Sequence, residues 1–194
     1  DFIKASLEEE GVDLSGVVIQ PDRISPYSFI AVDRSSGKRT IFWTRGNLDP
    51  LEPGQLDVEL IRAARMLHVD GLQMAAQLEA AKAARQGACK VIYDAGTFRE
   101  GSAELIAHCD YLVASEHFAA EFGGGSLEAS LKRLAAAGPA CVVLTLGEEG
   151  AVGWEAGQME RVPSLDVPVV DTTGAGDVYH GAFIHGISEG WSLR

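Results

Sequence analysis

The sequence predicts an α/β fold with a central, mainly parallel β-sheet flanked by helices. From Met66 onward, short apolar runs alternate with longer amphipathic runs, which is the rhythm of successive strand–helix units. The run Cys141–Thr145 is almost continuously apolar, as is typical of a strand in a parallel sheet that is buried on both faces. Farther on, Tyr179, Phe183 and Ile187 recur every four residues, as residues on one face of a helix do.

The strand–helix units can be followed along the chain from their own residues. Met66–Val69 is predicted to be the first strand. Leu72–Gln86 is predicted to be a helix because it is rich in alanine, glutamine and glutamate, and Gly87 stands where a C-terminal cap is common. The next units are a strand at Val91–Tyr93, a helix at Ala103–Ala107, a strand at Tyr111–Ala114, a helix at Leu127–Ala137 closed by Gly138 and Pro139, and the strand Cys141–Thr145.

The first part of the chain has a different character. Three β-like runs, Val17–Ile19, Tyr27–Val32 and Thr40–Trp43, are separated by polar turns. Asp33–Gly37 is a hairpin signal between the last two runs. We expect residues 17–45 to form a β patch, either as a lid that projects from the α/β body or as an edge meander of the main sheet.

Both ends of the chain favour an internal segment, residues 1–194, of one α/β domain. Asp1–Glu10 has the pattern of the middle of an amphipathic helix without an initiator methionine. Ser192, three residues from the end, could cap a further helix.

Composition limits the class of protein. With 46% hydrophobic residues and a mean hydropathy of +0.05, 194 residues are enough for one sizeable core. The net charge of −12 argues against a nucleic-acid or anionic-membrane surface as partner. No apolar run approaches the roughly 20 residues of a membrane span, and the first residues carry no secretion signal. A cytoplasmic enzyme is therefore expected.

The cysteines and histidines give no metal-site pattern. Cys89, Cys109 and Cys141 are widely spaced with no CxxC pair, so we expect reduced thiols in the core. His180 and His185 are five residues apart, which is a poor metal spacing on a helix, so packing or a solvent-facing role is favoured.

The most informative stretch is Asp171-Thr172-Thr173-Gly174-Ala175-Gly176-Asp177, which follows the short apolar segment Val167–Val170 and precedes the predicted helix. A helix N-terminus presents unpaired N–H groups and a positive dipole end, and glycines let an anion come close to the backbone. If that anion is the terminal phosphate of a nucleotide, a substrate hydroxyl can lose its proton to Asp177 as it attacks. The stretch therefore predicts a phosphotransferase site.

Two competing nucleotide motifs fail. The dinucleotide fingerprint Gly-x-Gly-x-x-Gly needs a glycine where Tyr179 stands. A Walker A loop needs Gly-Lys followed by Ser or Thr, but Gly37-Lys38 is followed by Arg39. The dinucleotide interpretation is weak and a P-loop is absent.

Residues 171–177 together resemble the signature of the ribokinase-like, or PfkB-type, carbohydrate kinases. The resemblance implies a ribokinase-like fold with a small β-sheet lid and ATP-dependent phosphorylation of a hydroxymethyl group of a small sugar. It makes Asp177 the catalytic base and the amides of Gly174, Ala175 and Gly176 the anion hole. It also implies that Asp171 and Thr173 help hold a monovalent cation such as K⁺.

Two further segments are similar to this family. Thr145-Leu146-Gly147-Glu148-Glu149-Gly150 resembles its Thr-Leu-Gly-x-x-Gly segment, which implies that Thr145 and Gly147, with Thr173, lie near the nucleotide. Glu10–Asp13, before the β-like runs, also looks like the family's. The ribokinase and ketohexokinase branch fits best.

One departure concerns magnesium. Where many members have Asn-x-x-Glu, this chain has Ser115 and Phe118, as ketohexokinase-like members also have serine there. Glu116 or Glu121 could supply a carboxylate only by a different geometry. We therefore expect Mg²⁺ to be carried chiefly by the phosphates of ATP. Polar residues that could line the rim of the site follow the predicted strands, namely His68, Asp70, Asp94 and Arg99.

The expected partner is a small sugar, without nucleic acid or membrane, and lids of such kinases can pair across a homodimer. The family's N-terminal strands, with most sugar contacts, and its adenine-side elements are absent from the sequence, so the sugar is not identified. Three alternatives stay open. They are a nucleoside or sugar-acid kinase of the same family, a non-catalytic sugar- or nucleotide-binding relative, and an NAD-linked oxidoreductase, which Tyr179 disfavours.

Overall fold

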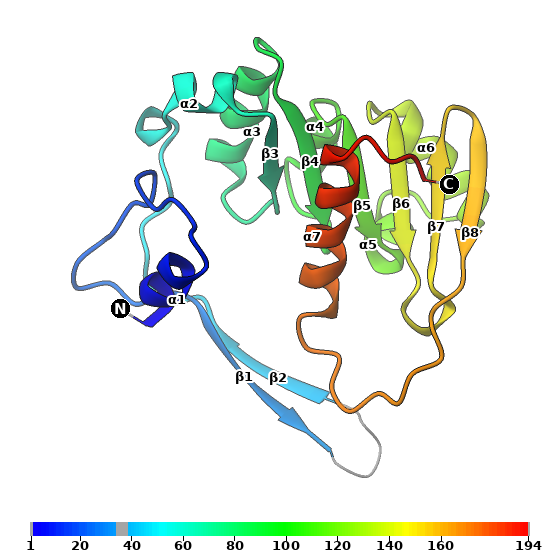
Figure 1. Ribbon diagram of the computed structural model, residues 1–194, viewed down its shortest axis with the longest axis horizontal. Helices are drawn as coiled ribbons and strands as arrows, with labels where there is room; N and C mark the ends of the chain where they lie inside the picture. The colour runs from blue at the N-terminus through cyan, green and yellow to red at the C-terminus, as the bar shows by residue number, and fades with distance from the viewer. Residues whose placement is uncertain (1, 34–38, 194) are drawn as a thin grey trace. The chain divides into compact units, whose positions relative to one another are not determined.

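The computed structural model describes residues 2–33 and 39–193, and the chain forms two compact units, Asp1–Pro50 and Leu51–Arg194 (Figure 1). The first unit contains helix α1 (Phe2–Glu9) and an antiparallel hairpin of strands β1 (Tyr27–Val32) and β2 (Arg39–Thr44). Phe29 pairs across the hairpin with Phe42, with ring centroids 6.2 Å apart. None of the described residues of this unit is buried.

The prediction of three β runs in the first unit is wrong in one respect. The two strands of the hairpin are present, but Val17–Ile19 is not a strand. A strand needs a partner for its N–H and C=O groups, and each strand of the described hairpin pairs only with the other. Pro21 and a left-handed Asp22 at φ 61° then turn the chain. Of the predicted turn Asp33–Gly37, all but Asp33 lies outside the described residues.

The second unit is built on a six-stranded sheet in the order β3-β4-β5-β6-β7-β8. Its first four strands are parallel and confirm the predicted sheet: β3 (Met66–Val69), β4 (Lys90–Ala95), β5 (Tyr111–Ser115) and β6 (Cys141–Thr145). Strands β7 (Ala151–Glu155) and β8 (Gln158–Val162) extend it as an antiparallel hairpin that the sequence analysis did not predict. The two residues of its turn, Ala156 and Gly157, both have positive φ, at 50° and 81°, and an alanine there gives little turn signal.

Helices and 3-10 turns connect these strands. The bounds are Pro53–Gln55 (η1), Val58–Ala63 (α2), Met74–Ala84 (α3), Ser102–Ile106 (α4), Glu116–Glu121 (α5), Leu127–Ala136 (α6), Gly147–Glu149 (η2) and Ala175–Ser188 (α7). Helices α2 and α5 were not predicted. Each is short and begins at a capping side chain, Asp57 for α2 and Ser115 for α5.

Gly87 is not the predicted cap of helix α3, which already ends at Ala84. Its φ is not in the left-handed range, so the reason for a glycine is spatial. A Cβ at position 87 would lie 2.7 Å from the backbone oxygen of Arg62, so glycine permits the close passage of the two chain segments.

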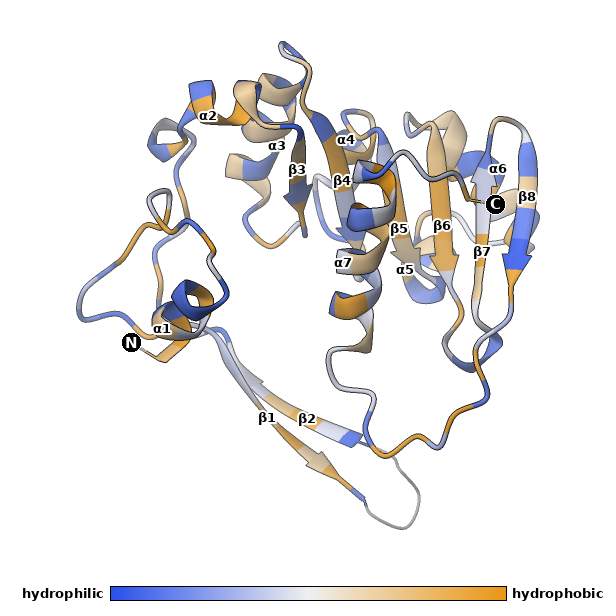
Figure 2. Ribbon diagram, viewed as in Figure 1, coloured by the Kyte–Doolittle hydropathy of each residue, from blue (hydrophilic) through white to orange (hydrophobic). Residues whose placement is uncertain are grey.

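Side chains alternate between the two faces of the sheet and meet different helices. One face, with Tyr93, Leu112 and Leu144, packs with the side chains of α3 to α6 in the larger core. The other face, with Val113, Cys141 and Val143, packs against Tyr179 and Phe183 of α7. Figure 1 shows α7 alone in front of the sheet, and Figure 2 shows hydrophobic colour along β4, β5 and β6 between the two layers.

The apolar segment Val167–Val170 before α7 pairs with no strand among the described residues. Val167, Val169 and Val170 are 56%, 65% and 84% exposed, so this lead-in is an extended connection on the surface. In the described part of the chain, no helix has the length and apolar character needed to cross a bilayer.

The expectation of buried, unpaired cysteines is confirmed. Cys89, Cys109 and Cys141 are free and between 0% and 4% exposed. Burial raises the pKa of the Cys109 and Cys141 thiols to about 12, and it raises the pKa of Cys89 as well. Thiolates of these residues are therefore scarce at neutral pH.

Native protein is expected to react very slowly with a thiol reagent such as DTNB at pH 8, because the thiolate is the reacting form and these thiols are buried. In concentrated guanidinium chloride all 3 thiols should react at once. Rapid, stoichiometric labelling of folded protein would contradict this packing.

Candidate functional site

Polar side chains gather at one edge of the parallel strands. Strands β3 to β6 run side by side in the same direction, so their carboxyl ends meet there. Asp70 follows β3, Asp94 lies near the end of β4, and Ser115 and Thr145 end β5 and β6 opposite each other. Helix α7 runs antiparallel to these strands, and its N-terminal end lies toward the same edge (Figure 1).

The glycine turn begins helix α7 with free donors. Gly174 is the residue before the helix and has φ 76° and ψ −1°, a left-handed conformation that glycine adopts without strain. The N–H of Ala175 donates to the carbonyl of Thr172 at 3.2 Å. The N–H groups of Gly174, Gly176 and Asp177 find no acceptor in the part of the chain that the structure describes. Three backbone donors are thus free to receive an anion.

Asp177 stands in the first turn of the helix, exposed, with its carboxylate leaning back over the turn. Its Oδ2 lies 3.9 Å from where a Cβ on residue 174 would be. A Cβ on Gly176 would meet nothing within 4 Å, so the approach to the backbone is open there. The carboxylate and the free N–H groups therefore face the same accessible turn.

Asp171 and Thr173 are joined in a local turn. The Oδ1 atom of Asp171 accepts hydrogen bonds from the N–H and the hydroxyl of Thr173, both at 2.8 Å. These contacts fix the entry to the glycine turn.

His180 joins the site, although its spacing from His185 in the sequence favoured packing or a solvent-facing role for it. The residue is only 7% exposed, and its Nδ1 lies 2.8 Å from the carbonyl oxygen of Gly176. Its Nε2 lies 3.4 Å from Oδ1 of Asp94, and the rings of His180 and His68 have centroids 6.0 Å apart. The contact joins β4 to α7, residues far apart in the sequence, so no local spacing signals it.

The electrostatics of this corner follow from burial and from the mixture of charges. Burial raises the pKa of the Asp94 carboxyl, with Asp177 and Asp70 acting in the same direction, while the imidazoles of His180 and His68 oppose the shift. Burial lowers the pKa of His68, which the charge of Asp94 opposes.

The expected nucleotide-side residues lie at the end of β6. The hydroxyl of Thr145 donates to the carbonyl of Ala114 at 3.4 Å. Gly147 has φ 58°, and a Cβ there would meet nothing within 4 Å, so the turn after the strand is open to a ligand. The N–H of Leu146 donates to the carbonyl of Gly150 at 2.8 Å and closes this turn.

The departure at Ser115 and Phe118 has a structural explanation. The Ser115 hydroxyl donates to the carbonyl of Gly96 at 2.9 Å and accepts the N–H of Phe118 at 3.0 Å, so it caps α5. Phe118 is fully buried in the core. Glu116 and Glu121 are exposed, and Glu121 lies 3.3 Å from Nε2 of His117. Position 118 itself therefore carries no carboxylate, and Glu116 or Glu121 could supply one only by a different geometry.

The described residues contain no group of three or more His, Cys, Asp and Glu side chains arranged to hold a metal ion. The donors of the glycine turn fit an anion, and they fit a metal only through the phosphates that it would accompany.

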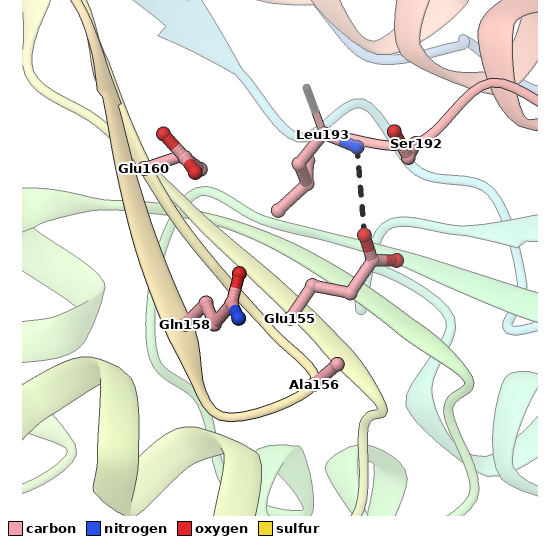
Figure 3. A pocket seen from close by; sticks show the side chains of 6 residues that line it. All are labelled: Glu155, Ala156, Gln158, Glu160, Ser192 and Leu193. Atoms are coloured by element: carbon pink, nitrogen blue, oxygen red, sulfur yellow. Dashed lines mark hydrogen bonds between the residues drawn. The ribbon is translucent and has the colours of Figure 1, made fainter.

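A separate small pocket lies between the β7–β8 hairpin and the segment after α7 (Figure 3). Glu155 accepts the N–H of Leu193 there at 3.4 Å. The residues that line it include none of the predicted site residues: Glu155, Ala156, Gln158, Glu160, Ser192 and Leu193.

The chain is similar to known carbohydrate kinases. The model of the pfkB family of carbohydrate kinases matches residues 1–194. A ribokinase of Lactococcus lactis is 35% identical over 117 residues, which are 60% of this chain and 38% of that protein. A ketohexokinase of Mus musculus is 27% identical over 207 residues, which cover 100% of this chain and 69% of that protein.

The fold is also that of solved kinase structures. A protein of E. coli proposed to be a ribokinase II, solved in complex with ATP and Mg²⁺, superposes with a TM-score of 0.87 at 20% identity, covering 100% of this chain and 67% of that one. The ribokinase-like fold predicted from the sequence is thereby confirmed.

The raised pKa of Asp94 sets the sign of a pH effect on stability. Stability linked to its proton is fully present below the ordinary pKa of 3.8 and is lost as the pH rises through the native pKa. The asparagine of Asp94→Asn cannot ionise. The free energy of unfolding of this variant should therefore increase relative to that of the parent as the pH rises from about 4 to 7. Urea unfolding at a series of pH values measures the difference.

Glu128→Gln is the control of opposite sign. The hydrogen bond from Lys132 lowers the pKa of Glu128. The free energy of unfolding of this variant should therefore decrease relative to that of the parent as the pH rises. A stability difference for Asp94→Asn that does not change with pH would contradict the assignment.

Proposed function

The chain belongs to the pfkB family of carbohydrate kinases, and we propose that it transfers the γ-phosphate of ATP to a hydroxymethyl group of a small sugar. The observation that carries the proposal is the first turn of α7. There, free N–H groups of Gly174, Gly176 and Asp177 share one accessible surface with the Asp177 carboxylate.

In the proposed reaction, Asp177 accepts the proton of the sugar hydroxyl while that oxygen forms a bond to the γ-phosphorus of ATP. The bond from the γ-phosphorus to the bridging oxygen breaks, and ADP leaves with the electron pair. The N–H groups of the turn stabilise the charge on the transferring phosphoryl oxygens. Positioning supplies most of the rate, so an aspartate is a sufficient base.

The proposed anion hole consists of the amides of Gly174, Ala175 and Gly176, and the free N–H of Asp177 joins them. Ala175 takes part if its 3.2 Å bond to the Thr172 carbonyl lengthens when the phosphate arrives. Thr145, Gly147 and Thr173 are proposed on the nucleotide side. What supports Gly147 is the open space beside it at the end of β6.

Magnesium, when bound with ATP, neutralises charge on its phosphates, and the site's own donors are amides that suit those phosphates. A monovalent cation such as K⁺ at Asp171 and Thr173, a homodimer and a cytoplasmic location stay predictions of the resemblance. The β1–β2 hairpin is proposed as the lid. Five large side chains exposed on its strands support a covering role: Tyr27, Phe29, Ile41, Phe42 and Trp43.

The substrate is proposed only as a class. The chain spans 38% of the length of the L. lactis ribokinase and 69% of the mouse ketohexokinase. In the complete protein, ADP release with D-ribose, D-fructose, adenosine and a sugar acid separates a sugar kinase from a nucleoside or sugar-acid kinase. Binding of ATP and sugar by calorimetry without turnover of any acceptor would favour a non-catalytic relative.

Asp177→Asn in the complete protein is expected to lower kcat by about 10²–10⁴-fold, because the sugar hydroxyl loses its proton acceptor. That loss corresponds to about 3–5 kcal/mol of barrier. Sugar-dependent ADP formation is the measurement, and ATP binding by calorimetry should change little.

Asp166→Asn, which alters an exposed carboxylate in the connection before the turn, is the matched control and should keep parental activity. If Asp177→Asn retained activity within about tenfold of the parent, the base assignment would be rejected.

A further inference from the structure

Asp94 and His180 are in contact beside the glycine turn, and hydrogen-bonding valence limits where their protons can lie. A carbonyl oxygen only accepts hydrogen bonds, so Nδ1 of His180, 2.8 Å from the Gly176 oxygen, must carry a hydrogen. Nε2 is fully buried and makes no hydrogen bond with the described residues, yet it lies 3.4 Å from Oδ1 of Asp94. The separation is slightly longer than the usual range of about 2.7–3.2 Å.

Two arrangements satisfy this geometry. Either Nε2 is also protonated and an imidazolium faces the Asp94 carboxylate, or Nε2 is bare and a protonated Asp94 donates to it. A bare Nε2 facing an ionised carboxylate would set the buried lone pair of the imidazole against the charge of Asp94, whose side chain is 25% exposed, and this is unfavourable. In both remaining arrangements one proton lies between the two side chains, and the pair is neutral overall.

The other end of the imidazole acts on the site. The Gly176 carbonyl belongs to the peptide that links Gly176 to Asp177, and the N–H of that same peptide is one of the three free donors. The peptide is planar, so fixing its oxygen also fixes the direction of its N–H. The same contact fixes the position of the backbone nitrogen of Asp177, which belongs to this peptide.

We propose that Asp94 and His180 form a neutral, proton-sharing pair that positions the Gly176–Asp177 peptide of the phosphoryl-transfer site. The inference rests on the proposed function. His180 is a positioning residue in it, because it reaches the transferring phosphoryl group only through this peptide. An Asp94 charge without its imidazole partner would stand beside an anion site that already contains Asp177.

The charged surroundings make neutrality matter. The groups that face the pair are His68 and Asp70 from the β3 side and Asp177 from α7. With Asp94 they amount to three carboxylates near a place where triphosphate must bind, in a chain of net charge −12. A shared proton neutralises one of these negative charges and keeps the bond from Nδ1 of His180 to the Gly176 carbonyl.

The first test reads the protons directly and needs no substrate. In the complete protein labelled with ¹⁵N-histidine, Nδ1 of His180 should show the chemical shift of a protonated ring nitrogen at neutral pH. In Asp94→Asn the new amide donates to Nε2. Nε2 should then show the chemical shift of a ring nitrogen that accepts a hydrogen bond. An unprotonated Nδ1 in the parent overturns the proposal, whether or not the protein is a kinase.

The second test separates the two contacts of His180 by substitution. His180→Asn places an amide near the position of Nδ1 but leaves Asp94 without its partner, and we expect kcat to fall by about 30-fold or more. Asp94→Asn keeps the Gly176 contact and a neutral pair, so its loss should be smaller. The matched control is His185→Asn, an exposed histidine of the same helix, which should match the parent.

The probes are MgATP with D-ribose and with D-fructose, and kcat and KM are measured from pH 5 to 10. The parent should lose activity as the pH rises and the pair gives up its shared proton, and Asp94→Asn should lack that loss. If His180→Asn is as active as His185→Asn, or if Asp94→Asn loses activity with rising pH as the parent does, the proposal is overturned. If Asp177→Asn also kept its activity, the proposed function would fail, while the nitrogen shifts would still decide the proton-sharing pair.

Discussion

Parallel pairing of β3, β4, β5 and β6 is the constraint on which the rest of this structure depends. It makes four chain segments end at one edge, and it forces each return to pass through helices on the faces of the sheet. Alternation of side chains then sorts the residues: Tyr93 and Ala95 turn toward the larger core, while Asp94, between them, turns toward α7. A carboxylate beside the glycine turn is thus a consequence of strand register.

Helix α7 uses different residues of its N-terminal half for packing and for chemistry. Tyr179 and Phe183 hold it against β5 and β6, and this contact determines where its N-terminal end stops. His180, next to Tyr179, points to β4 and is one of few buried polar residues in the described chain. Since the apolar contact fixes the helix and the imidazole fixes one peptide, the free donors of the turn are held in place before any ligand arrives.

The sequence predicted well wherever a local pattern decides the structure. The run Cys141–Thr145 and the four-residue spacing of Tyr179, Phe183 and Ile187 became β6 and α7 because apolar periodicity determines which residues are buried. Prediction from the sequence failed where contacts between distant segments determine the structure. Val17–Ile19 found no partner strand, the β7–β8 turn uses an alanine at positive φ, and Gly87 is needed for the approach of Arg62. The Asp94–His180 contact joins residues from two elements and leaves no spacing to detect.

Gly174 and Gly176 are glycines for different physical reasons. Both reasons are local, so the motif can be predicted from the sequence, whereas the Asp94–His180 contact beside it cannot. Gly174 needs a left-handed backbone, a property of the residue itself. Gly176 needs only open space for an anion to approach. Asp177 creates the difficulty, because a carboxylate beside a bound triphosphate is repelled, and Asp94 would add to that repulsion. Sharing a proton with His180 removes that second charge, so the base can keep its own while the amides face a phosphate.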